Sequence, residues 1–335
     1  MIKEAIYKFI NKEDLSLDEA KEVMDEIMSG NTSNAQIAAF ITALRMKGET
    51  IDEITACAMV MRRYGLKLFH EGDVLDIVGT GGDEANTFNV STVSSIVISA
   101  AGIPVAKHGN RSVSSKCGSA DVLEALGVKI DIPVERSQQL LREIGICFLF
   151  APMYHSSMKY AAPVRKELGV RTIFNILGPL ASPANANLQL LGVYDENLVE
   201  PMARVLANLG VKRAMVVHGH DGLDEISLSA KTTVCEVNDG RINSFFLDPH
   251  QFGFDYCKRE ELIGGNPTMN ADIARAILSG EKGPKRNIVL LNSAICLYMT
   301  YNNITLRECV RLAEQTIDSG KAMDQLNSFI RLSNE

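Results

Sequence analysis

The chain has 335 residues, and its 41 acidic and 34 basic side chains give a formal net charge of −7. Its 46% hydrophobic and 22% charged residues are typical of a folded protein with a buried core. At about 150 residues per domain, the length predicts two domains. An acidic chain without basic blocks is a poor nucleic-acid binder, because such binding depends on neutralising phosphates. A local pocket for a small anion remains compatible with this charge.

Two features bear on the cellular compartment. The longest apolar stretch, residues 288–299, is interrupted by Asn292 and Ser293, so we predict no membrane-spanning helix and no membrane partner. The first 15 residues mix charged and apolar side chains, unlike a signal or transit peptide. The seven cysteines are widely spaced and form no CxxC pair, which argues against disulfide scaffolds and cysteine-rich zinc sites. We therefore expect a reducing, cytoplasmic location.

The first 70 residues predict a small all-helical domain. Ser16, followed by Asp18 and Glu19, predicts a capped helix start, and Ser33 begins a second helix with apolar residues at helical spacing. Residues 50–68 predict a third helix.

Residues 71–335 predict a larger α/β domain. Strands and helices alternate here, which indicates a mainly parallel sheet covered by helices. Helical patterns after residue 270 should pack back over the sheet or the first domain. The expected strands are 74–78, 103–106, 146–150, 187–193 and 213–218, and the expected helices between them are 90–101, 120–126, 135–144 and 198–209.

A glycine cluster follows the first predicted strand. Residues 79–83 read GTGGD, and the next helix begins near Asn89 and Ser91. Glycines allow peptide N–H groups to turn inward, and a helix start offers free N–H groups, so the segment predicts a phosphate cradle. A tight turn without a ligand is the alternative. The segment is neither GxGxxG nor a P-loop, which disfavours dinucleotides and nucleoside triphosphates.

The polar segment 107–115, KHGNRSVSS, follows the second predicted strand. Ligands of parallel sheets bind beyond the carboxyl ends of strands, so the two cations and three hydroxyls of this segment suit a phosphorylated ligand. The alternative is a solvated loop. A lone histidine is more often structural, so we assign His108 no proton transfer, and we assign no general base elsewhere.

The segment 221–225, DGLDE, follows the strand that ends at residue 218. In a loop, Asp224 and Glu225 can face one point, and with the hydroxyl of Ser91 they suit Mg²⁺ shared with substrate phosphates. An exposed acidic turn is the alternative. Arg165 lies among apolar residues and could bind the carboxylate of a flat apolar substrate, although a surface arginine is the commoner case.

Together these segments resemble the anthranilate phosphoribosyltransferase family, in order and spacing, over nearly the whole chain. Pyrimidine nucleoside phosphorylases share something like the KHGNR and GSAD segments, but their glycine loop differs. The motifs that carry the resemblance are GTGGD at 79–83, TFNVST at 87–92, KHGNRSVSS at 107–115, GSADVLEALG at 118–127, PVRKELGVRTIFNILGPL at 163–180 and DGLDE at 221–225.

The resemblance implies transfer of a phosphoribosyl group from phosphoribosyl diphosphate (PRPP) to anthranilate in tryptophan biosynthesis, with release of pyrophosphate. It also implies a homodimer formed through the helical domain. Anthranilate would contact Gly79, Asn110 and Arg165, and Mg²⁺ would be held by Ser91, Asp224 and Glu225. The implied PRPP-binding residues are Gly79, Gly82, Asp83, Thr87, Asn89, Val90, Ser91, Thr92, Lys107, His108, Gly109, Asn110, Arg111, Ser112, Val113, Ser114, Ser115 and Ser119.

One stretch departs from the family pattern. Members often read His-Pro-Ala-Met where this chain has His155-Ser156-Ser157-Met158, which affects the anthranilate side of the site. The alternative functions are a pyrimidine nucleoside phosphorylase and a non-catalytic nucleic-acid-binding relative. The net charge and the intact motifs oppose the second of these.

Overall fold

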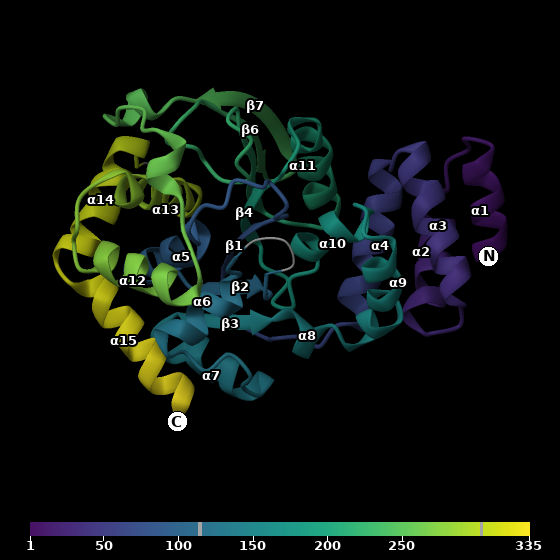
Figure 1. Ribbon diagram of the computed structural model, residues 1–335, viewed down its shortest axis with the longest axis horizontal. Coiled ribbons are helices and arrows are strands. Elements are labelled where there is room, and N and C mark those ends of the chain that lie inside the picture. The colour runs from purple at the N-terminus through teal and green to yellow at the C-terminus, as the bar shows by residue number, and fades with distance from the viewer. Residues whose placement is uncertain (113–115, 302–303) are drawn as a thin grey trace.

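The computed structural model describes residues 1–112, 116–301 and 304–335. At one end lies a bundle of four helices (Figure 1). Three of these helices begin in capping boxes, at Ser16, Ser33 and Thr50. The hydroxyl of each residue accepts the backbone N–H three residues later, and the glutamate or glutamine side chain at that later position accepts the backbone N–H of the first residue. The bundle helices are α1 (Ile2–Ile10), α2 (Leu17–Met28), α3 (Asn34–Lys47) and α4 (Ile51–Tyr64).

A seven-stranded sheet forms the centre of the larger part, in the order β3-β2-β1-β4-β5-β6-β7. The first five strands run parallel, as the sequence predicts, and the last two form an antiparallel hairpin that the sequence analysis missed. The turn of that hairpin, Asp239-Gly240, has positive φ at both residues. The strands are β1 (Leu75–Gly79), β2 (Val105–Gly109), β3 (Ile146–Phe150), β4 (Leu188–Gly192), β5 (Arg213–Gly219), β6 (Thr232–Asn238) and β7 (Arg241–Leu247).

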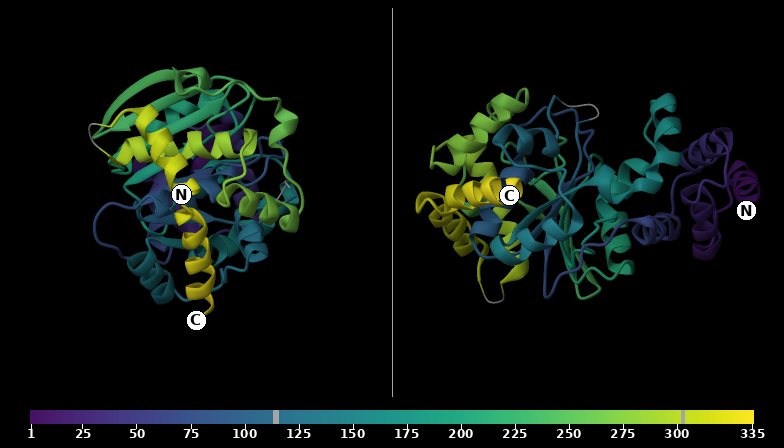
Figure 2. Two further views of the ribbon diagram at one scale, coloured as in Figure 1. Left: turned by 90° about the vertical axis from the view of Figure 1, so that its left-hand side faces the viewer. Right: turned by 90° about the horizontal axis from the view of Figure 1, so that it is seen from below.

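Helices cover both faces of the sheet (Figures 1 and 2). The C-terminal helices pack against the α/β part of the molecule and not against the helical bundle. The helices α13 and α15 contact α5, and α12 contacts α6. These helices are α5 (Val90–Ala100), α6 (Ser119–Leu126), α7 (Val134–Ile144), α8 (Ala151–Tyr154), α9 (Ala162–Leu168), α10 (Phe174–Leu180), α11 (Val199–Asn208), α12 (Pro267–Leu278), α13 (Pro284–Thr300), α14 (Leu306–Asp318) and α15 (Lys321–Asn334). Short 3₁₀ helices span Ser156–Tyr160, Glu196–Leu198, Pro249–Phe252 and Arg259–Leu262.

Two apolar cores hold the molecule together. One lies between the sheet and the C-terminal helices. The other is continuous from the helical bundle through α10 and α11 to the opposite face of the sheet. The helix α9 comes from the middle of the chain, yet it packs against α3 of the bundle. Among the described residues, we find no helix with the length and apolar character needed to span a bilayer.

Candidate active site

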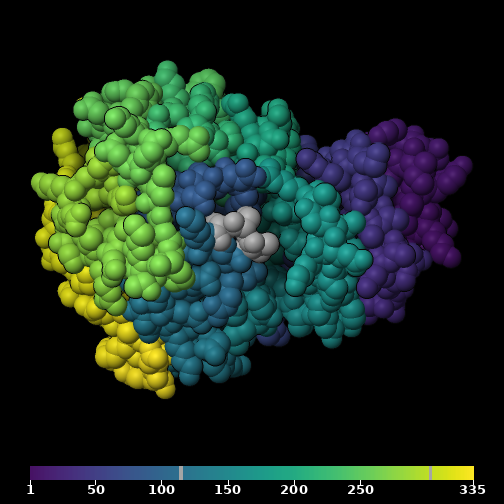
Figure 3. All heavy atoms as spheres, viewed as in Figure 1, coloured from purple at the N-terminus to yellow at the C-terminus, as the bar shows by residue number. Residues whose placement is uncertain are grey.

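The carboxyl ends of β1, β2, β4 and β5 meet at one edge of the sheet, which we call the rim. The glycine loop follows β1, the polar segment follows β2, and the segment 221–225 follows β5. A short antiparallel bridge joins Thr87 to Ile263, so the start of α5 also lies against the segment before α12. Figure 3 shows this surface, where blue segments from the first part of the sheet meet green segments of the later chain.

Two glycines let the acidic segment cross the strand ends. Gly79 and Gly192 are paired residues of neighbouring strands. A Cβ at Gly79 would lie 2.4 Å from Asp224 Oδ2, and a Cβ at Gly192 would lie 1.5 Å from the Asp224 carbonyl oxygen. The Gly81 N–H donates to Asp224 Oδ2 at 2.7 Å. The sequence analysis did not select Gly192, because its role arises only from the passage of residue 224 above it.

Asp224 is buried and Glu225 is partly buried, and the pKa values of both carboxyl groups are raised. Burial, followed by repulsion from Asp83, raises the pKa of Asp224 to about 7. Burial, followed by repulsion from Asp224, raises the pKa of Glu225 to about 8. The Ser91 N–H donates to Glu225 Oε1 at 3.3 Å. Carboxyl groups that repel one another in this way are stabilised by a cation between them.

These side chains fit Mg²⁺. Carboxylate and hydroxyl oxygens are the ligands it prefers, and it is usually held by one or two carboxylates together with waters and substrate phosphates. Within the described ranges, no group of three His, Cys, Asp or Glu side chains converges to hold a metal by itself.

The strand β2 begins two residues later and ends three residues later than the sequence predicts, so Lys107 and His108 belong to the strand. Lys107 is buried, and its Nζ donates to the Ile77 C=O at 2.6 Å and to Ser91 Oγ at 3.2 Å. Burial lowers its pKa, while Asp76 and Glu225 oppose that shift. The ammonium group therefore lies beneath the rim and faces the acidic pair.

His108 points to the other face of the sheet. Its ring is buried with its centroid 5.2 Å from that of His155, and its backbone N–H donates to Asp76 Oδ1 at 3.0 Å. Burial lowers the pKa of His108 to about 3 and that of His155 to about 4. Both imidazoles are therefore neutral at pH 7.

The end of β2 packs closely on the start of α6. A Cβ at Gly109 would lie 2.3 Å from Ser119 Oγ, and the Asn110 C=O accepts the Ser119 hydroxyl at 3.2 Å. Arg111 forms an ion pair with Asp121 at 3.0 Å and another with Glu124, so its charge is already balanced. The Ser112 N–H donates to Asp121 Oδ2 at 3.1 Å. Val113, Ser114 and Ser115 lie outside the described residues.

At the start of α5, Asn89 donates from its Nδ2 to the Cys117 C=O at 3.1 Å. Thr87 and Asn89 are partly exposed beside the glycine loop, whereas Val90 and Thr92 are buried. The structure thus gathers Gly79, Gly82, Asp83, Ser91 and the acidic segment at one rim. The apolar side chain of Val90 offers no polar atom, so only its backbone could hydrogen-bond a ligand, whereas the buried Thr92 hydroxyl has no hydrogen-bond partner among the described residues.

Two arginines of the segment 163–180 make different contacts. Arg165, on α9, is half-buried with its guanidinium 5.4 Å from the centre of the Phe174 ring, and burial lowers its pKa. Arg171, which the sequence analysis did not select, donates to the Gly82 C=O and lies 4.2 Å over the Tyr194 ring. Arg171 therefore ties the glycine loop to the segment that follows α9.

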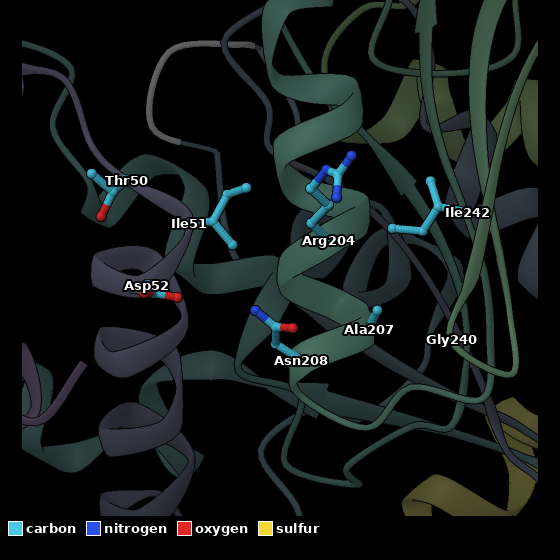
Figure 4. A pocket seen from close by; sticks show the side chains of 8 residues that line it. All are labelled: Thr50, Ile51, Asp52, Arg204, Ala207, Asn208, Gly240 and Ile242. Atoms are coloured by element: carbon cyan, nitrogen blue, oxygen red, sulfur yellow. The ribbon is translucent and has the colours of Figure 1, made fainter. Parts of the chain in front are cut away.

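A separate cleft of about 520 Å³ opens between the start of α4 and α11 (Figure 4). Its lining includes Asp52, Arg204, Asn208 and Gly240. Asn208 ends α11 just before β5 begins, and Gly240 lies in the turn beside that same strand end. This cleft therefore lies at the amino ends of the strands, opposite the rim.

Comparison with known proteins gives one consistent family. The helical bundle domain of a glycosyl transferase family matches residues 3–65, and its a/b domain matches residues 71–323. Anthranilate phosphoribosyltransferase of Ruminiclostridium cellulolyticum is 71% identical, covering 100% of this chain and 98% of its own. The enzyme of Methanobrevibacter smithii is 60% identical over 100% of both chains.

Solved structures agree. The crystal structure of anthranilate phosphoribosyltransferase from Thermus thermophilus superimposes with a TM-score of 0.94 at 42% identity, covering 99% of both chains. The Saccharomyces cerevisiae enzyme in complex with PRPP and Mg gives 0.90 at 31% identity, covering 99% of this chain and 98% of its own. These relatives and the two domain matches show that the chain belongs to the anthranilate phosphoribosyltransferase family of glycosyltransferases, which transfer the phosphoribosyl group of PRPP to anthranilate in tryptophan biosynthesis.

Proposed function

We propose that the rim is where this chain joins PRPP to anthranilate. The observation that carries the proposal is the convergence of the glycine loop, the start of α5 and the acidic pair Asp224 and Glu225 at one sheet edge. Gly81 and Gly82 have φ of 67° and 77°, so the loop has a conformation that favours glycine and its backbone can come close to a ligand. Such a loop suits the diphosphate of PRPP, the ligand present with Mg in the yeast structure.

In the proposed reaction, the amine of anthranilate attacks C1 of the ribose, and pyrophosphate leaves with the bonding electron pair. Negative charge then grows on the diphosphate, so peptide N–H groups fixed around it lower the barrier. Ser91, Asp224 and Glu225 would hold Mg²⁺, which supplies further stabilisation of that charge. Lys107 holds Ser91 in place from below through its 3.2 Å contact.

The anthranilate side is proposed from the residues between the rim and the helical domain. Arg165 would bind the carboxylate, with Gly79 and Asn110 beside the ring. Ser156 is exposed and Ser157 is buried in the 3₁₀ helix that follows His155. This pair would alter the wall of the pocket where relatives often have Pro-Ala. A Saccharomyces cerevisiae relative, at 30% identity, has been solved in complex with 4-fluoroanthranilate, an analogue of this substrate.

A homodimer through the helical domain is supported by the surface of α1 and α3. The helix α3 buries Ile37 and Phe40 inward, yet its outer face carries Ala39 and the 74% exposed Met46. Beside it, α1 exposes 70% of Tyr7. An apolar outer face on a helix that already has an apolar inner face suits a second copy. Light scattering should show a dimer that Met46→Glu with Tyr7→Lys converts to monomer, and an unchanged mass would refute this surface.

We further propose a helical domain of residues 1–70, an α/β domain of residues 71–335, and closure of the gap between them on substrate. Small-angle scattering curves should differ with and without PRPP and Mg²⁺, and overlaying curves would count against closure. No disulfide joins any of the seven cysteines, all of which lie within the described residues, and this supports action in the reducing cytoplasm.

The direct test follows the fluorescence of anthranilate, which should fall only when PRPP and Mg²⁺ are both present. A phosphorylase would instead release the free base from a nucleoside with inorganic phosphate, and it would leave the anthranilate signal unchanged. Persistence of the signal in the complete mixture would refute the proposed transfer.

A further inference from the structure

A buried amide from the C-terminal part of the chain reaches the proposed PRPP site. Asn270, in the first turns of α12, is 2% exposed. Its Oδ1 accepts the Gly265 N–H at 2.7 Å, and its Nδ2 donates to Asn89 Oδ1 at 3.0 Å. Asn89 then donates to the Cys117 C=O at 3.1 Å. Three hydrogen bonds therefore run in series from α12, through the start of α5, to the residues just before α6.

The two ends of this series fix its direction. The Gly265 N–H donates at one end and the Cys117 C=O accepts at the other, and the Cys117 side chain also interacts with Asn270. Each amide consequently has a single orientation that satisfies both of its neighbours. If Asn270 lost its donor, nothing in this series would hold the Asn89 amide with its nitrogen toward Cys117.

Packing leaves little room for a different arrangement. A Cβ at Gly264 would lie 2.6 Å from Asn270 Oδ1 and 2.7 Å from Cα of Phe88. The Phe88 N–H also donates to the Leu262 C=O at 3.2 Å. The segment before α12 is therefore pressed against the entry to α5, and the amide of Asn270 lies at that contact.

We infer that Asn270 is a positioning residue for PRPP: it acts through Asn89 to hold the starts of α5 and α6 at a fixed separation. This inference rests on the proposed placement of PRPP at the start of α5. Groups held in their bound geometry cost less to order when the ligand arrives. Loss of the series should consequently weaken PRPP and leave anthranilate almost unaffected.

Two variants test the inference. Asn270→Ala removes both hydrogen bonds, whereas Asn270→Asp keeps the acceptor for Gly265 and places a second acceptor against Asn89 Oδ1. We expect KM for PRPP to rise about tenfold in each variant, the effect of one oriented hydrogen bond, with KM for anthranilate changed less than about twofold. Because KM does not depend on the amount of folded enzyme, partial unfolding cannot produce this result.

Arg275→Ala is the matched control. Arg275 lies on the same helix and donates to the Leu126 C=O at 2.8 Å, so this variant loosens α12 without touching Asn89. It should lower thermal stability and leave KM for PRPP unchanged. An equal rise of this KM in the control would mean that any loosening of α12 weakens PRPP, and would overturn the inference.

The background variant Asn89→Ala separates the two proposals. If Asn89→Ala alone leaves KM for PRPP unchanged, PRPP is not held at the start of α5, and the placement itself fails. If Asn89→Ala raises this KM, adding Asn270→Ala should raise it no further. A full additional rise, or no effect of Asn270→Ala by itself, overturns the positioning role while the placement stands.

Discussion

The passage of residue 224 over Gly192 gives a sharp test of the site. In Gly192→Ala, the new Cβ would start 1.5 Å from the Asp224 carbonyl oxygen, whereas an ordinary contact begins at 3.4 Å. The atoms in the way are backbone, so the acidic segment must move by about 2 Å, which is the difference between those distances. A misplacement of about 1 Å can cost roughly a hundredfold in rate. We therefore expect kcat/KM to fall at least about a hundredfold.

The assay is steady-state turnover at several Mg²⁺ concentrations, with thermal unfolding measured alongside. Val193→Ala is the control, because it removes fully buried apolar volume from the neighbouring position and should cost about 2 kcal/mol of stability while sparing turnover. If Gly192→Ala were folded and kept turnover within about threefold of this control, the acidic segment would not need its observed place, and the reasoning would be wrong.

Three further predictions concern charge. Asp224→Asn combined with Glu225→Gln should lower turnover about a hundredfold at limiting Mg²⁺, and normal turnover there would refute the metal assignment. Arg165→Ala should raise KM for anthranilate about tenfold, and a change confined to PRPP would instead place this arginine on the phosphates. The buried His108 and His155 have pKa values of about 3 and 4 when folded, against 6.5 when unfolded. Protonation of these imidazoles below pH 6.5 therefore favours the unfolded state, and their contribution to stability should fall by about 4 kcal/mol for the pair between pH 7 and pH 5, while the raised pKa values of Asp224 and Glu225 act in the opposite direction. Urea unfolding of the parent protein and of His155→Gln at both pH values isolates the histidine part: on going from pH 7 to pH 5 the variant should be spared about 2 kcal/mol relative to the parent, and an equal change in both would contradict the reasoning.

Local sequence signals predicted much of the fold. The helix starts at Ser16, Ser33 and Thr50 follow from capping boxes, and the parallel strands follow from apolar runs between helical patterns. The sequence did not predict where β2 ends, because Lys107 and His108 resemble loop residues. They stay in the strand because neighbouring groups, chiefly the Ile77 C=O and Asp76, satisfy them.

Only those parts of the site that belong to sequence motifs could be predicted. The glycine loop and the acidic pair stand out in the sequence, and the structure places them at one rim. Gly192, Arg171 and Asn270 matter through contacts across at least 30 residues of chain, so no local pattern marks them. A glycine at a strand end, an arginine in a loop and an asparagine in a helix are all common, so residue type does not mark them either.

The contact between α9 and α3 bears on how the chain could be divided. The bundle shares its apolar core with α10 and α11, which lie more than 100 residues further along the chain. A fragment ending near residue 70 would leave the inner faces of α3 and α4 without their cover. Such a fragment should aggregate when expressed alone and regain solubility only when the remainder of the polypeptide is co-expressed to complement it.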